Sequence, residues 1–87
     1  MRFIYNSGVL EELSRHGVIP SQETDPEIVH DFVNALYLFE IRKLRARMIA
    51  GEIPKSDYAA HVDALRRRYP VLGVPFRLWA SIEQDAE

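Results

Sequence analysis

The stretch Thr24–Gly51, TDPEIVHDFVNALYLFEIRKLRARMIAG, contains the clearest structural signal in this 87-residue chain. It opens with two residues that commonly cap helices, Thr24 and Asp25, and continues with Pro26 in the first helical position. No further proline or glycine occurs until the glycine that ends the stretch. The sequence therefore predicts a helix over about residues 26–50, which is long for a chain of this size.

The apolar residues of this helix do not follow one side. At about 100° per residue, the first half gathers one group on one side: Ile28, Val29, Phe32, Ala35, Leu36 and Phe39. The second half gathers another group on a side rotated by roughly 90° or more: Tyr37, Ile41, Leu44 and Met48. A single apolar stripe indicates one partner surface, whereas a rotating one indicates two. The segment 35–39, ALYLF, is apolar all round, which is typical of a helix covered on most sides.

The residues before the long helix predict a shorter one over about 7–16. Ser7 is in position to cap it, and Gly17 follows it as a stop signal. The preceding segment 2–5, RFIY, could be extended or could continue the helix. A loop with the sequence GVIPSQET then leads to the long helix.

Two further helices are expected after the long one. A turn with the sequence GEIP precedes a helix over about 55–69, which should stop before Pro70 because a residue preceding proline avoids helical geometry. Pro75 can open a short helix over about 75–84. The prediction is a single all-α domain over 1–87, a small bundle of three main helices with a short C-terminal fourth.

Length and composition limit the class of protein. The hydrophobic share of 47% is enough for a core, but a chain of 87 residues can build only a thin one. The chain has no cysteine, which excludes disulfides, zinc fingers, iron–sulfur sites and thiol catalysis. No apolar run is long enough to span a bilayer, and the N-terminal residues do not resemble a signal peptide. We therefore expect a cytoplasmic protein that does not enter membranes.

A homodimer built on the long helix would cover its all-apolar middle. The alternative is that the other helices of the same chain enclose it. The residues proposed for self-association are Leu38, Phe39, Glu40 and Trp79. Trp79, in the segment VLGVPFRLW, either caps the core or forms an exposed anchor. Glu40 lies inside the apolar band of the helix. The simpler interpretation is that it forms an ion pair within the chain, and the alternative is that it makes a polar contact at an interface.

The charges are unevenly distributed although the net charge is only −2. Residues 42–68 contain eight basic and three acidic side chains, and the remaining residues contain three basic and ten acidic ones. The candidate basic patch is formed by Arg42, Lys43, Arg45, Arg47, Arg66, Arg67 and Arg68. Such a patch could meet an acidic protein, including a second copy, could bind nucleic acid through phosphates, or could be a solvated face.

The three consecutive arginines at 66–68, in the sequence RRRYP, do not by themselves make a binding site. Consecutive helical residues point about 100° apart, so the three cannot share a face. They also lie in the last turn of a helix, where cations stabilise the negative end of the dipole. This ordinary role accounts for all three.

We find no pattern that carries catalysis. The three histidines, His16, His30 and His61, are not spaced three or four residues apart, as a helical chelating pair requires. No serine lies in a nucleophile elbow, and no glycine-rich phosphate loop is present. We therefore expect no enzyme activity, no metal and no cofactor.

The segment 46–65, ARMIAGEIPKSDYAAHVDAL, resembles the helical hairpin of short C-terminal modules of the SHOCT type. The likeness consists of a turn with the pattern Gly-x-Ile and an acidic and aromatic start to the next helix, and it covers less than a quarter of the chain. Here the segment is central rather than C-terminal, so we assign no family from it. The resemblance would imply an interaction or oligomerisation role.

Together, these patterns predict a non-catalytic interaction or accessory protein that self-associates through its long helix as a homodimer. An acidic protein is the other expected partner. A weak nucleic-acid-binding protein that uses the basic end of the helical hairpin is the alternative function.

Overall fold

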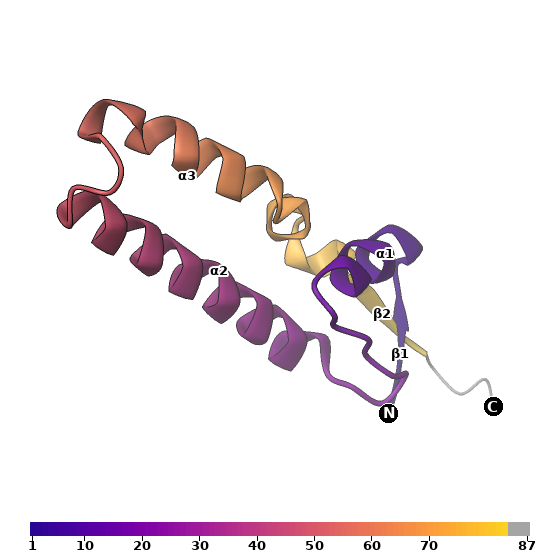
Figure 1. Ribbon diagram of the computed structural model, residues 1–87. Helices are drawn as coiled ribbons and strands as arrows, with labels where there is room; N and C mark the ends of the chain where they lie inside the picture. The colour runs from indigo at the N-terminus through magenta and orange to yellow at the C-terminus, as the bar shows by residue number, and fades with distance from the viewer. Residues whose placement is uncertain (84–87) are drawn as a thin grey trace.

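The structure is a computed structural model that describes residues 1–83. It contains three α-helices and a two-stranded antiparallel sheet within those residues (Figure 1). The elements in chain order are β1 (Arg2–Tyr5), α1 (Ser7–Arg15), α2 (Pro26–Ile49), α3 (Tyr58–Arg67) and β2 (Ala80–Glu83). Three short 3₁₀ turns accompany them: η1 (Lys55–Asp57), η2 (Pro70–Gly73) and η3 (Phe76–Leu78).

The long helix α2 forms where the sequence predicts it. The side chain of Asp25 caps its N-terminus by accepting a hydrogen bond from the Glu27 amide at 2.9 Å, and Pro26 takes the first helical position. At the C-terminus, Gly51 adopts a φ of 81° and its amide donates to the Met48 carbonyl at 3.0 Å. A left-handed glycine of this kind is a common helix stop.

The first helix is confirmed, but its cap is not the predicted one. Asn6, rather than Ser7, caps α1, because its side-chain oxygen accepts from the amides of Gly8 at 2.8 Å and Val9 at 3.3 Å. Asn6 holds the extended backbone of a cap residue, since a strand rather than a helix precedes it. Gly17, with a φ of 75°, ends the helix as expected.

The third helix is also confirmed, with shorter limits. Its predicted first turn is the 3₁₀ turn η1, so the α-helix begins at Tyr58. It ends at Arg67, and Tyr69 leaves the helical region with a φ of −124° and a ψ of 50° because Pro70 follows it.

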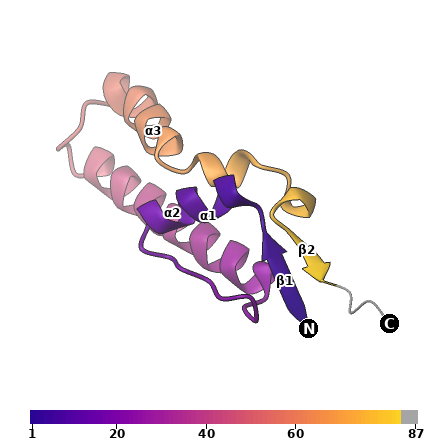
Figure 2. The same ribbon diagram turned by 90° about the vertical axis from the view of Figure 1, so that its right-hand side faces the viewer.

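The prediction of an all-α fold was wrong. β1 pairs with β2 in an antiparallel register that places Phe3 opposite Ile82, and an ion pair of 3.7 Å links Arg2 to Glu83 at one end of the pair. The predicted α-helix over 75–84 is therefore absent where the structure describes it, and residue 84 of that prediction lies outside the described residues. Figure 2 shows the two strands side by side, at the end of the molecule remote from the α2–α3 turn.

Trp79 explains why this segment is not a helix. Its side chain is fully buried, and its indole N–H donates to the Val74 carbonyl at 3.2 Å. Its own backbone carbonyl accepts from the Asn6 amide at 2.8 Å, where β1 ends. Trp79 itself has a φ of −68° and a ψ of −41°, and the chain becomes extended only after it, at Ala80. The extended residues pair with β1 and satisfy the backbone groups of both strands, which a continued helix would not do.

The core is a thin layer along an elongated molecule. Its buried side chains come from all three helices, from the α2–α3 turn and from the segment after α3: Val9, Leu13, Val29, Val33, Leu44, Ile53, Leu65, Tyr69, Val71 and Trp79. The molecule measures 62 × 18 × 16 Å and has a radius of gyration of 16.4 Å, against about 12 Å for a compact domain of this length. No helix within residues 1–83 is long and apolar enough to cross a membrane.

Candidate interaction surfaces

The side of α2 that faces away from the core is largely apolar. The opposite, core-facing side carries the buried residues Val29, Val33 and Leu44. On the outer side the exposed fractions are 66% for Ile28, 53% for Phe32, 59% for Phe39 and 72% for Ile49. Side chains of this size are seldom left exposed together without a partner.

These residues follow a heptad spacing. Together with three further residues they form a set of seven, all exposed, in which successive positions are separated alternately by four and three residues. We call this set the α2 stripe: Ile28, Phe32, Ala35, Phe39, Arg42, Ala46 and Ile49. A stripe with this spacing is the pattern by which two helices pack along each other.

Sequence reasoning missed this stripe as a unit. Grouping the apolar residues of the first half placed the buried Val29 together with the exposed Ile28 and Phe32. The alternation of four and three residues over the whole helix was the signal that could have separated them.

The four residues predicted for self-association lie in different places. Leu38, which is 41% exposed, and Phe39 are both on the outer surface of α2. Glu40 is half-buried on the opposite side, toward α3. Trp79 is buried inside the chain, where the ring of His30 approaches it edge-on at 5.0 Å, so its side chain offers no surface to a partner.

Glu40 joins three elements within one chain. Its carboxylate accepts a hydrogen bond from the Tyr69 hydroxyl and lies 3.9 Å from the Arg68 guanidinium. His16, at the end of α1, stacks on the Tyr69 ring at a centroid distance of 4.2 Å. The pKa of Tyr69 is raised to about 12, mainly by burial and next by the hydrogen bond to Glu40. The cluster of Glu40, Arg68, Tyr69 and His16, which we call the Tyr69 cluster, therefore stabilises the packing of α1 and α3 on α2.

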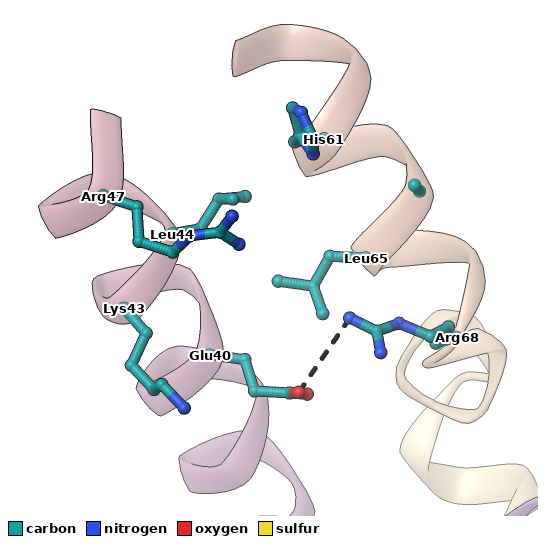
Figure 3. A pocket seen from close by; sticks show the side chains of 8 residues that line it. Glu40, Lys43, Leu44, Arg47, His61, Leu65 and Arg68 are labelled. Atoms are coloured by element: carbon teal, nitrogen blue, oxygen red, sulfur yellow. Dashed lines mark ion pairs between the residues drawn. The ribbon is translucent and has the colours of Figure 1, made fainter. Parts of the chain in front are cut away.

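One group of basic residues lines a cleft between α2 and α3, with a volume of about 380 Å³ (Figure 3). Its cations are Lys43 and Arg47 from α2 and Arg68 from the end of α3. Arg68 extends across the cleft toward Glu40, and Arg47 lies 3.4 Å from Glu52. Both guanidinium groups are thus already paired with carboxylates.

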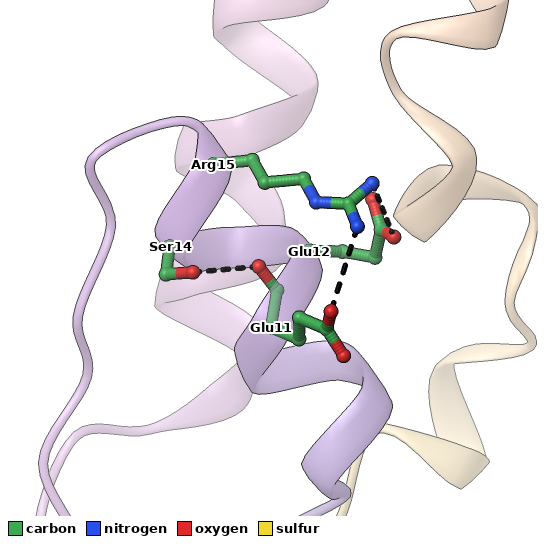
Figure 4. Close-up of polar contacts among 4 residues, drawn as sticks. All are labelled: Glu11, Glu12, Ser14 and Arg15. Atoms are coloured by element: carbon green, nitrogen blue, oxygen red, sulfur yellow. Dashed lines mark hydrogen bonds and ion pairs between the residues drawn. The ribbon is translucent and has the colours of Figure 1, made fainter.

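Arg67 and Arg68 also line a second cleft, of about 440 Å³, beside α1. Its other charged residues include Arg15, which Figure 4 shows reaching toward both Glu11 and Glu12 of its own helix. These ion pairs are 3.5 and 3.2 Å long. Both acidic and basic side chains line this cleft, so it is not a purely cationic surface.

The remaining arginines of the predicted patch lie elsewhere. Arg42 belongs to the α2 stripe, and Arg45 is exposed beside it. Arg66 lines a small, mainly apolar cleft with Tyr37 and Tyr69. The structure therefore divides the predicted patch over several faces and does not form one phosphate-facing surface.

The three histidines are likewise apart. His16 belongs to the Tyr69 cluster, His30 contacts Trp79, and His61 lines the α2–α3 cleft. Among residues 1–83, no group of three His, Asp or Glu side chains is placed to hold a metal ion.

Comparison with protein-family models, curated proteins and solved structures found no match to this chain.

Proposed function

We propose that this protein is a non-catalytic interaction protein that self-associates through the α2 stripe. The observation that carries this proposal is the exposed apolar stripe, with its heptad spacing, on the longest helix of the chain. As part of the proposal we place the protein in the cytoplasm, in keeping with its cysteine-free sequence.

The shape of the molecule supports the same proposal. A thin, elongated core stabilises a chain less than a compact core of equal length would. Pairing along α2 would bury Ile28, Phe32 and Phe39 and would thicken the molecule along its narrow dimension. Burial of the stripe would therefore stabilise the folded protein.

The test is the molar mass in solution of a Phe39→Glu variant. Phe39 lies outside the core, so the variant should fold, and a charge in the centre of the stripe should convert a dimer into a monomer. Asn34→Glu is the matched control, because Asn34 is exposed on the same helix outside the stripe. We expect sedimentation equilibrium to give a dimer for wild type and the control and a monomer for Phe39→Glu. A wild-type monomer at every concentration would refute the proposal.

A second proposal, weak nucleic-acid binding, rests on the three cations of the α2–α3 cleft, Lys43, Arg47 and Arg68. It is supported less, since two of the three are paired with carboxylates. Binding of labelled DNA or RNA should then fall steeply between about 50 and 200 mM salt and should be lost in Lys43→Glu. An acidic protein partner would use the same cations.

A further inference from the structure

The residues on the outer side of α2 indicate how a second copy of the chain would pack against it. We propose that two copies pair through their α2 stripes in antiparallel orientation, with Phe39 of each copy packed on the partner's Ala35. This inference rests on the proposed self-association and specifies its orientation and register. The charges beside the stripe and the sizes of the residues in it both favour this arrangement.

The charges along one edge of the stripe change sign from one end of α2 to the other. Glu27 and Asp31 lie toward the N-terminus, and Arg45 lies on the same edge toward the C-terminus. All three are exposed; the Asp31 side chain is 78% exposed and lies 4.0 Å from the ring of its neighbour His30. Parallel pairing would place acidic ends beside each other and basic ends beside each other. Antiparallel pairing places each acidic end beside a basic end, and charges in these flanking positions set helix orientation.

The register follows from heptad geometry. In an antiparallel pair, residues that flank the stripe on one edge meet residues on the same edge of the partner. The edge formed by Asp31, Leu38 and Arg45 repeats every seven residues. When Leu38 meets the partner's Leu38 across the two-fold axis, Asp31 meets the partner's Arg45 twice, once on each side. This arrangement is self-complementary, as a two-fold interface requires.

The same register fits large side chains against small ones. Phe39 faces the partner's Ala35, and Ile28 faces the partner's Ala46. Phe32 faces the partner's Arg42, whose aliphatic stem can cover the ring while the guanidinium reaches solvent. Alternation of large and small residues in facing positions is what fills an interface without voids.

A shift of one heptad removes these advantages. A shift in the first direction places Asp31 against the partner's Leu38. A shift in the second direction places Arg45 against the partner's Leu38. The second shift also sets Ala35 against the partner's Ala46, which leaves a gap between two small side chains. Only the proposed register matches charge and size together.

The first test reverses the charges. We expect Asp31→Arg alone and Arg45→Asp alone to weaken the dimer roughly tenfold, because each creates like-charge contacts on both sides of the axis. The double variant Asp31→Arg/Arg45→Asp restores opposite charges in both contacts, so its dissociation constant should return to within about twofold of wild type. Its net charge equals that of wild type, which removes general charge effects. Analytical ultracentrifugation measures all four proteins.

The second test measures orientation. The chain has no native cysteine, so Ser56→Cys on the exposed α2–α3 turn accepts a single nitroxide. The 24 residues of α2 span about 36 Å, and antiparallel pairing should therefore hold the two labels at least about 35 Å apart. Parallel pairing would bring them within about 20 Å. Pulsed electron paramagnetic resonance separates these distances.

The outcomes distinguish the two proposals. A protein that stays monomeric, or a dimer that survives Phe39→Glu, overturns both self-association through the stripe and the register. A dimer that Phe39→Glu disrupts but whose labels are close keeps the proposed function and overturns the antiparallel orientation. Distant labels without recovery in the double charge variant overturn the register alone.

Discussion

At the scale of single residues, Glu40 shows how one contact determines the role of a side chain. Its position within an apolar band is visible in the sequence, and an intramolecular ion pair is the simpler expectation for such a carboxylate. The structure shows that ion pair with Arg68 and adds a hydrogen bond from Tyr69. The tyrosine could not be foreseen, because the two residues are 29 positions apart and meet only after α3 has packed on α2.

Tyr69→Phe should lower stability mainly at neutral pH. The raised pKa means that folding favours the neutral phenol, so this contribution is complete below pH 10 and is lost as the pH rises toward 12. As the pH rises toward 12, the free energy of unfolding of wild type should fall by on the order of 2 kcal/mol from this group. Tyr69→Phe has no such group, so urea unfolding should show the gap between the two proteins narrowing from pH 9 to pH 11.5.

Tyr5 provides the internal reference for this experiment. Burial, and then the nearby Asp25 charge, raise its pKa as well, and it is present in both proteins. The variant should therefore still lose some stability at high pH, but less than wild type. Identical pH profiles for the two proteins would contradict the assignment to Tyr69.

At the scale of secondary-structure elements, local signals account for the helices and fail for the strands. Asp25, Pro26 and Gly51 lie at the ends of α2 and act through contacts within a few residues, so the sequence predicts its limits closely. The strands are only four residues each, too short for a periodic pattern, and each one needs the other end of the described chain to satisfy its backbone. In the sequence, Trp79 also fits the predicted C-terminal helix, and only the structure shows that its side chain is buried in the core.

The α2 stripe could also have been predicted in part. Its spacing is present in the sequence, but Leu36 and Val29 are as apolar as Phe32 and differ from it only in what covers them. Burial by α1 and by the segment after α3 is a tertiary property, and it separates the side that packs inward from the side that remains exposed.

Gly51→Ala should destabilise the α2–α3 turn by about 1 kcal/mol. Gly51 has a φ of 81°, a region that a residue with a Cβ atom adopts at a cost, although no atom would collide with that Cβ. Gly73→Ala is the control, because Gly73 has no positive φ and equally open surroundings. Thermal unfolding should show a lower Tm for Gly51→Ala and an unchanged or slightly higher Tm for the control. Equal shifts in both would show that backbone strain is not the cause.

At the scale of the whole molecule, stability should depend on protein concentration. A dimer stabilises its folded subunits by mass action, so the Tm of wild type should rise with concentration. In Phe39→Glu this dependence should disappear, while the fold recorded by circular dichroism should remain. Calorimetry over a hundredfold range of concentration measures both proteins. A wild-type Tm that does not move would show that the elongated monomer is stable by itself.

The pairing of β1 with β2 also sets an order of events during biosynthesis. About 75 residues separate the two strands along the chain, so at 5–20 residues per second β1 is synthesised roughly 4 to 15 seconds before its partner. The α2–α3 pair depends on nearby residues and can form in that interval, whereas β1 cannot. We therefore expect the helical hairpin to form before the sheet, which can close only once Trp79 and the residues after it have emerged.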